Sequence, residues 1–117
     1  MELNAITHEI IGSAMDVHSA FGPGMLESAY EKCLVYELAQ RGFFVESQVV
    51  LPLTYKGITI DAGYRLDLRV AQAVIVEVKA IQATDLMHRA QLLVISDLPA
   101  VVSVSSSTLT CHALSMG

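Results

Sequence analysis

Several features that would assign this chain to a membrane or to an oxidising compartment are missing from its sequence. The 117 residues include only two cysteines, Cys33 and Cys111, whose separation fits neither a disulfide framework nor a metal-ligand motif. No apolar stretch is long enough to cross a bilayer, although 53% of the residues are hydrophobic. The first residues lack the basic start and the apolar block of a signal peptide. We therefore expect a cytoplasmic chain without a membrane segment.

Basic residues are also scarce. Seven lysines and arginines against twelve acidic residues give a net charge of -5, which argues against non-specific adhesion to a phosphate backbone. Clustered basic side chains, or cations bound by the carboxylates, would still allow contact with nucleic acid. The length fits one domain, residues 1–117, and no repeat, low-complexity tract or linker divides it.

Two amphipathic helices are predicted at the start of the chain. The first runs from Asn4 to Phe21, with Asn4 or Thr7 as its N-cap, and Gly22-Pro23-Gly24 ends it. Pro23 can stand at the entry of the second helix, which ends at Arg41-Gly42. The apolar stripes of the two helices are Ile6, Ile10, Ala14, Val17 and Phe21, and then Leu26, Tyr30, Cys33, Leu34 and Leu38.

Strand-like segments follow this helical hairpin. They are Phe44 to Leu53, then Ile58 to Ile60 after a tight Tyr55-Lys56-Gly57 turn, then Tyr64 to Val70 and Val74 to Ala80. Asp85 can cap a further helix whose apolar positions are Leu86, Ala90 and Leu93. This order predicts an α+β domain with a central mixed sheet of about four to five strands.

The two central strands bring carboxylates together. If Ala71-Gln72-Ala73 is a three-residue hairpin loop, Asp67 faces Glu77 across the ladder, with their Cβ atoms about 5 Å apart. Such a pair is unfavourable unless something offsets its charge, and a divalent cation would do so. Lys79 projects from the same face as Glu77, while the valines of that strand project from the other.

This constellation suits phosphodiester hydrolysis, because carboxylate oxygens hold Mg²⁺, the metal activates water, and an ammonium orients or polarises the nucleophile. A Glu-x-Lys alone is weak evidence, since Glu and Lys often form a solvated strand face. A surface ion cluster on a structural domain is therefore the alternative for Asp67, Glu77 and Lys79. The aliphatic residues around them favour a site.

Three segments of the chain resemble known sequences. Asp67 with Glu77-Val78-Lys79 resembles the signature of the PD-(D/E)xK nuclease superfamily, with Leu66 in place of the proline before the aspartate. The segment from Gly24 to Tyr30 is similar to the GxxExxY pattern of a family of small bacterial and archaeal proteins, and Asp61 to Asp67 resembles that family's second block. The resemblance covers roughly residues 6 to 93.

The resemblance implies a PD-(D/E)xK nuclease-like fold and a site with further members. It adds Glu27 as a third carboxylate that binds Mg²⁺ or Mn²⁺ with Asp67 and Glu77, and Gln91 as a support of the metal site. DNA is the implied substrate, with RNA as a further option, and nucleases of this size often form homodimers. Without the resemblance, Glu27 has a sufficient explanation in the helix dipole. Tyr30 is expected in the core and Gly24 in the turn.

His88 lies on the same helical face as Gln91, but a helical histidine is more often structural or exposed than part of a site. Related nucleases of the RecB type have a tyrosine four residues after that glutamine, where this chain has Ile95.

The resemblance stops after residue 93, and residues 94–117 form a divergent tail. We tested a change of reading frame by joining the third base of each codon to the first two bases of the next. One permitted choice of third bases places a tyrosine four residues after Gln91, then a Thr-Gly-Arg-Arg turn and an aliphatic strand ending in Asn-Phe-Asn. A frame-shifted tail is therefore our hypothesis. The segment from Ala100 to Val104 still has the composition of a strand.

Two functions follow as hypotheses. The first is an Mg²⁺-dependent nuclease-like domain in which Lys79 assists the attacking water. The second is a nucleic-acid-binding or protein-binding module of the same fold without turnover, which the acidic balance and the altered tail favour.

Overall fold

The computed structural model describes residues 1–79, 86–106 and 111–115, which form three helices and seven strands. The helices are α1 (Leu3–Phe21), α2 (Glu27–Gln40) and α3 (Leu86–Ser96). The strands are β1 (Val45–Val50), β2 (Leu53–Tyr55), β3 (Ile58–Ile60), β4 (Arg65–Val70), β5 (Val74–Lys79), β6 (Ala100–Ser105) and β7 (Cys111–Ser115).

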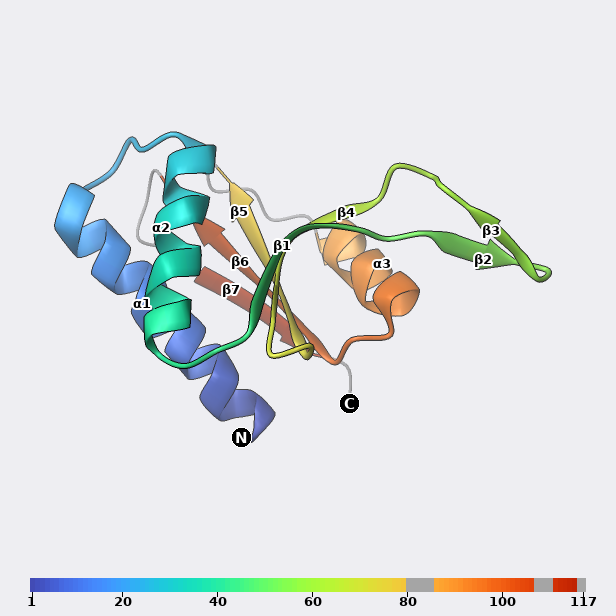
Figure 1. Ribbon diagram of the computed structural model, residues 1–117, viewed down its shortest axis with the longest axis horizontal. Helices are drawn as coiled ribbons and strands as arrows, with labels where there is room; N and C mark the ends of the chain where they lie inside the picture. Colours follow the sequence, from blue (N-terminus) through green and yellow to red (C-terminus); the bar gives the residue numbers. More distant parts are fainter. Residues whose placement is uncertain (80–85, 107–110, 116–117) are drawn as a thin grey trace.

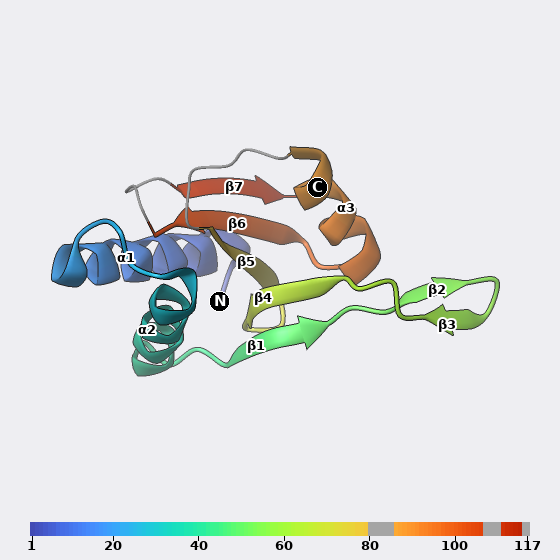
Figure 2. The ribbon, with the colours of Figure 1, turned by 90° about the horizontal axis from the view of Figure 1, so that it is seen from above.

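Five strands form one mixed sheet in the order β1-β4-β5-β6-β7, in which only β5 and β6 run parallel. Strands β2 and β3 pair only with each other and form a two-stranded arm that leaves the body of the molecule (Figure 1; Figure 2). The expected α+β class and the expected number of strands in the central sheet are both confirmed.

Each face of the sheet has its own apolar core. The larger core joins α1 and α2 to residues of β4, β5 and β6, among them Leu68, Val76 and Val102. The smaller core joins Leu92 and Leu93 of α3 to the opposite face, among them Leu66, Ile75 and Val101. The sheet is therefore covered by helices on both faces, and consecutive residues of β5 and β6 alternate between the two cores.

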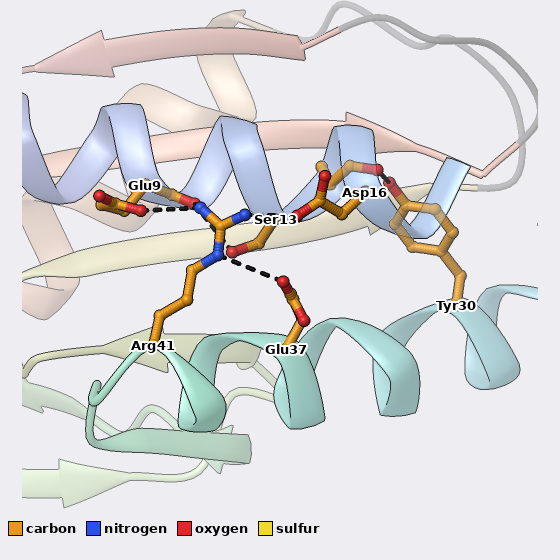
Figure 3. A network of polar contacts seen from close by, with 7 residues as sticks. Glu9, Ser13, Asp16, Tyr30, Glu37 and Arg41 are labelled. Carbon is orange, nitrogen blue, oxygen red and sulfur yellow. Dashed lines mark hydrogen bonds and ion pairs between the residues drawn. The ribbon is translucent and has the colours of Figure 1, made fainter. Parts of the chain in front are cut away.

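The two N-terminal helices are fixed to each other by Arg41, just after α2 (Figure 3). Its guanidinium donates to Glu9 at 2.7 Å, to Asp16 at 2.6 Å and to Glu37 at 3.3 Å. A Cβ at Gly12 would lie only 2.9 Å from Nη1 of this arginine, so the absence of a side chain at Gly12 lets the group cross α1.

Tyr30 is buried, and its hydroxyl donates to the carbonyl oxygen of Ala14 at 3.3 Å, which confirms its place in the core. Gly24 adopts a φ of 93°, which suits its predicted role in the turn.

The helix boundaries differ from the predicted ones. Helix α1 begins before Asn4, with Glu2 as the N-cap, so neither Asn4 nor Thr7 caps it. Helix α2 begins at Glu27 after an extended Leu26, so Pro23 lies in the connection rather than at the helix entry. The end residues of the two stripes, Phe21 and Leu26, are exposed, so neither belongs to the core.

The strand predictions were too long in one place. The predicted strand from Phe44 to Leu53 ends at Val50, because Pro52 has no N–H to continue the ladder. Leu53 instead begins β2, the first strand of the arm. The Lys56-Gly57 turn is present, with φ of 51° and 77°.

Asp85, the predicted cap of α3, lies outside the described residues. Of the three apolar positions predicted for this helix, only Leu93 is buried, whereas Leu86 and Ala90 face solvent. The strand predicted from Ala100 to Val104 is confirmed as β6, buried along its whole length.

Candidate functional site

The ladder between β4 and β5 ends where the site was expected. Leu68 pairs with Val76 as predicted, but the β4–β5 ladder ends at this pair, so Asp67 and Glu77 are not ladder partners, contrary to the prediction. Instead, the carboxylate of Asp67 accepts a hydrogen bond from the backbone N–H of Val78 at 2.8 Å. A side chain thus takes the place of a backbone partner, and the two strands part at Asp67.

The other neighbour of β4 changes direction at the same level. Gln48 in β1 has a φ of 53°, and the pairs on either side of it bracket Asp67. Leu66 and Leu68, only two residues apart, pack in different cores. Since such residues share a face in a regular strand, the sheet must twist sharply at Asp67. The carboxylate therefore lies at a split in the sheet rather than on one face.

On the side of α2, Asp67 lines a hollow of about 190 Å³. Glu27, the first residue of α2, and Glu31, one turn later, line the same hollow. The amide of Gln48 donates to both carboxylate oxygens of Glu31, at 3.0 and 3.2 Å. Burial, and then the charge of Asp67, raise the pKa of Glu31. The structure thus brings Glu27 and Asp67 to one cavity, with a second helical carboxylate beside them.

On the side of α3, Glu77 is 5% exposed. Burial raises the pKa of its carboxyl above the ordinary value, and the charge of Asp67 adds to this, while Lys79, His88 and Arg89 oppose it. Nε2 of His88 lies 3.3 Å from Oε1 of Glu77, so the two form an ion pair when the imidazole is protonated. His88 therefore does contact the predicted site, although its sequence position favoured a structural role.

Within the part of the chain that the structure describes, the buried Oε1 of Glu77 has no hydrogen-bond partner beyond its ion-pair contact with His88, and the buried Nε of Arg89 has none either. Arg89 is 3% exposed and stands on the buried side of α3 with Leu92 and Leu93. Buried charged atoms without hydrogen bonds are costly in a protein interior.

Sequence reasoning missed Glu31 and Arg89. Glu31 could have been found from its position four residues after Glu27, which puts both on one helix face. Arg89 could have been found as a charged residue within the buried helical stripe of Leu92 and Leu93. Gln91 is exposed on α3, and within the described residues no hydrogen bond or ion pair joins it to Asp67, Glu77 or Lys79.

In residues 1–79, 86–106 and 111–115, no three His, Cys, Asp or Glu side chains lie together closely enough to hold a metal ion. Mg²⁺, however, is usually held by only one or two carboxylates and completes its shell with water and substrate phosphates. The carboxylates of Asp67 and Glu77, with the buried Oε1 that lacks a hydrogen bond among the described residues, offer hard oxygen donors of this kind. These residues fit a hard divalent cation.

A mixed sheet between helices, with an aspartate where two strands part and a Glu-x-Lys on the neighbouring strand, defines a nuclease-like α+β fold. Residues 4–98 match the PD-(D/E)XK nuclease superfamily, and the chain belongs to that superfamily. Nucleases of this superfamily typically use Mg²⁺ or Mn²⁺. No curated protein and no solved structure matches the chain. None of the described helices has the length and apolar character needed to cross a bilayer.

Proposed function

We propose that this chain is a cytoplasmic, Mg²⁺- or Mn²⁺-dependent nuclease-like protein of the GxxExxY type that hydrolyses phosphodiester bonds in DNA, with RNA as a further substrate. The observation that carries the proposal is the buried Glu77 carboxylate next to Asp67 at the split in the sheet. Among the described residues, its Oε1 has no hydrogen-bond partner and makes an ion-pair contact with His88, at 3.3 Å. An oxygen of this kind is stabilised when a cation binds to it.

Asp67 and Glu77 would hold the cation, and Glu27 would complete its ligands across the hollow that it shares with Asp67. When bound, the metal would supply a nucleophilic water and neutralise phosphate charge. The backbone N–H of Val78 holds the Asp67 carboxylate in one orientation. Lys79, two residues after Glu77 in β5, would orient the attacking water, and exposed Gln91 would support the site from α3.

A nicking assay tests this proposal. Supercoiled plasmid and single-stranded DNA would be incubated with Mg²⁺ or Mn²⁺ and the parent chain, Lys79→Ala, Asp67→Asn or the control Lys32→Ala. We expect the first two substitutions to reduce cleavage at least about 100-fold and the control to leave it unchanged, because Lys32 is exposed on α2. Equal cleavage by all four proteins would exclude this site.

Calorimetry with Mn²⁺ separates metal binding from turnover. Binding that is lost in Glu77→Gln but kept in Lys79→Ala supports the assigned ligands. Binding by the parent and Glu77→Gln alike would remove Glu77 from the metal site.

The second candidate is a binding module without turnover. The net charge of -5 favours it. The divergent tail favours it too, because its last 19 residues, 99–117, lie beyond the range that matches the superfamily. The frame-shift hypothesis enters here, because the inferred reading carries arginines that this tail lacks, and arginine is suited to holding phosphate. The gene's nucleotide sequence tests that reading. A chain with the restored frame that binds DNA but cleaves no substrate would favour the binding module.

A further inference from the structure

The arm formed by β2 and β3, residues 53–60, has one apolar face. The pairs Leu53–Ile60 and Tyr55–Ile58 lie directly opposite each other, so these four side chains share a face, and Thr54 and Thr59 share the other. Tyr55 and Ile58 are 62% and 64% exposed. A two-stranded hairpin is at best marginally stable alone in water, so this face would gain from a cover.

The apolar face of the arm continues the smaller core. Val49 and Leu51 pack in that core, and Leu53 and Tyr55 follow them at every second residue. The backbone N–H of Leu51 donates to the carbonyl of Tyr64, which extends the pairing of β1 and β4 toward the arm. The smaller core, to which α3 contributes Leu92 and Leu93, includes Leu51 and Val49 but not Leu53 or Tyr55. The arm is therefore the uncovered part of a face that is buried elsewhere.

Helix α3 is apolar on its outward side as well. Its outer stripe consists of Leu86, Met87 and Val94, which are 61%, 84% and 69% exposed. At 100° per residue these three lie within one arc of the helix, opposite the buried Leu92. Ala90 lies between them on this arc and Gln91 lies just beyond Met87, and both are exposed and uncharged. A helix covering a sheet normally presents polar residues outward, so this stripe is unusual.

We propose that the arm of one copy of this chain covers the outer stripe of α3 in a second copy, and that the reverse contact forms at the same time. The arm and α3 lie at the same end of the molecule (Figure 1; Figure 2), so a two-fold arrangement can form two identical contacts there. This inference does not depend on nuclease activity.

The area and the charge both fit a second copy. The large exposed side chains of the arm and stripe offer on the order of 100 Å² each, roughly 600 to 700 Å² per copy, close to the ~800 Å² per partner of a standard interface. Lys56 is the one charged residue in the arm. A surface that holds nucleic acid needs several cations, so the arm suits an apolar protein surface better.

Analytical ultracentrifugation tests the proposal. The parent chain is expected to be a dimer, and Ile58→Lys or Val94→Glu is expected to raise the dimer dissociation constant at least about 100-fold, because each places a charge in both contacts. The matched control is Phe21→Glu, an equally exposed apolar residue on the helical hairpin, which should leave the constant unchanged. Circular dichroism verifies that each variant is folded.

Mixing the two variants gives the sharper result. In a mixed dimer of Ile58→Lys with Val94→Glu, one contact is native and the other pairs a lysine with a glutamate. We therefore expect the mixture to form dimers at concentrations where each variant alone is monomeric.

A parent chain that is monomeric at about 100 μM, a dimer unaffected by both variants, or a mixture that stays monomeric would each overturn the proposal. So would an Ile58→Lys variant that loses affinity for a DNA oligonucleotide while the parent remains monomeric, since the arm would then belong to a nucleic-acid site.

Discussion

The two faces of the central sheet are built from the same strands but are filled differently. Toward α1 and α2, the residues contributed by β5 and β6 are apolar, and the core extends over both helices. Toward α3, the same strands contribute Glu77 and Ser103 beside Ile75 and Val101, and α3 adds Arg89. One face is an ordinary hydrophobic core. The other encloses charge.

This difference separates stability from chemistry. Each buried charged atom without a hydrogen bond costs on the order of 1–3 kcal/mol, and both Glu77 and Arg89 carry one. The face toward α1 and α2 must offset that cost. It follows that substitutions on the two faces should change the free energy of unfolding in opposite directions, and the following experiments test that contrast.

The largest effect is expected in the larger core. Leu34 is fully buried between α2 and the sheet, so Leu34→Ala should lower the free energy of unfolding by about 2–5 kcal/mol, through lost burial and the cavity left behind. Urea denaturation measures it. The control is Leu26→Ala, at an exposed position just before α2, which should change stability by less than about 0.5 kcal/mol. A comparable loss in both variants would contradict the division into faces.

On the charged face, by contrast, a substitution should raise the free energy of unfolding. Because burial raises the pKa of Glu77 in the folded state, the folded protein binds more protons than the unfolded chain between the ordinary glutamate pKa and the raised one. Stability contributed by this group is present at low pH and lost as pH rises through that window.

Glu77→Gln removes this loss and should make the metal-free protein roughly 1 kcal/mol more stable above the window. Urea denaturation in EDTA across acidic to weakly alkaline pH measures the difference between variant and parent. That difference should grow with pH. A difference that is constant, or that shrinks with pH, would show that Glu77 is not the source.

A smaller loss is expected from the polar contacts between α1 and α2. Arg41→Ala removes three carboxylate partners, but the guanidinium is partly exposed, so the loss should be only about 1 kcal/mol. Thermal unfolding at low and high salt measures it, with Lys32→Ala as the near-neutral control. A loss as large as that of Leu34→Ala would mean that this network, rather than the apolar core, holds the helices.

The smallest effect concerns the loop that joins the two central strands. Gln72 has a φ of 54°, which strains a residue with a Cβ, so Gln72→Gly should raise stability by about 0.5–1 kcal/mol despite the greater freedom of the unfolded chain. Ala73, where φ is not positive, provides the control, and Ala73→Gly should give no gain. Equal effects at both positions would rule out backbone strain as the cause.

Much of the fold could be predicted because its signals are local. Helical periodicity located α1 and α2, and the alternation in β5 correctly separated Glu77 from its neighbouring valines. The three-residue loop set the register of Leu68 and Val76. These features depend on a few adjacent residues, so the sequence contains them directly.

The site was predicted less completely because it depends on a distortion of the sheet. Nothing near Gln48 in the sequence indicates its positive φ, and the parting of strands at Asp67 follows from three segments meeting there. The approach of His88 to Glu77 depends on how α3 packs, which periodicity alone does not fix. The assignment of Asp67, Glu77, Lys79, Glu27 and Gln91 to catalysis stays a prediction.

The position of β6 also determines when the chain can fold during its synthesis. This strand lies between β5 and β7 and is buried on both faces, yet it comprises only residues 100–105. Until those residues leave the ribosome, Val74, Val76 and the other apolar residues of β5 have no neighbour on one side. Until then the helices and the first strands form an incomplete sheet with an open edge, which exposes the nascent chain to aggregation.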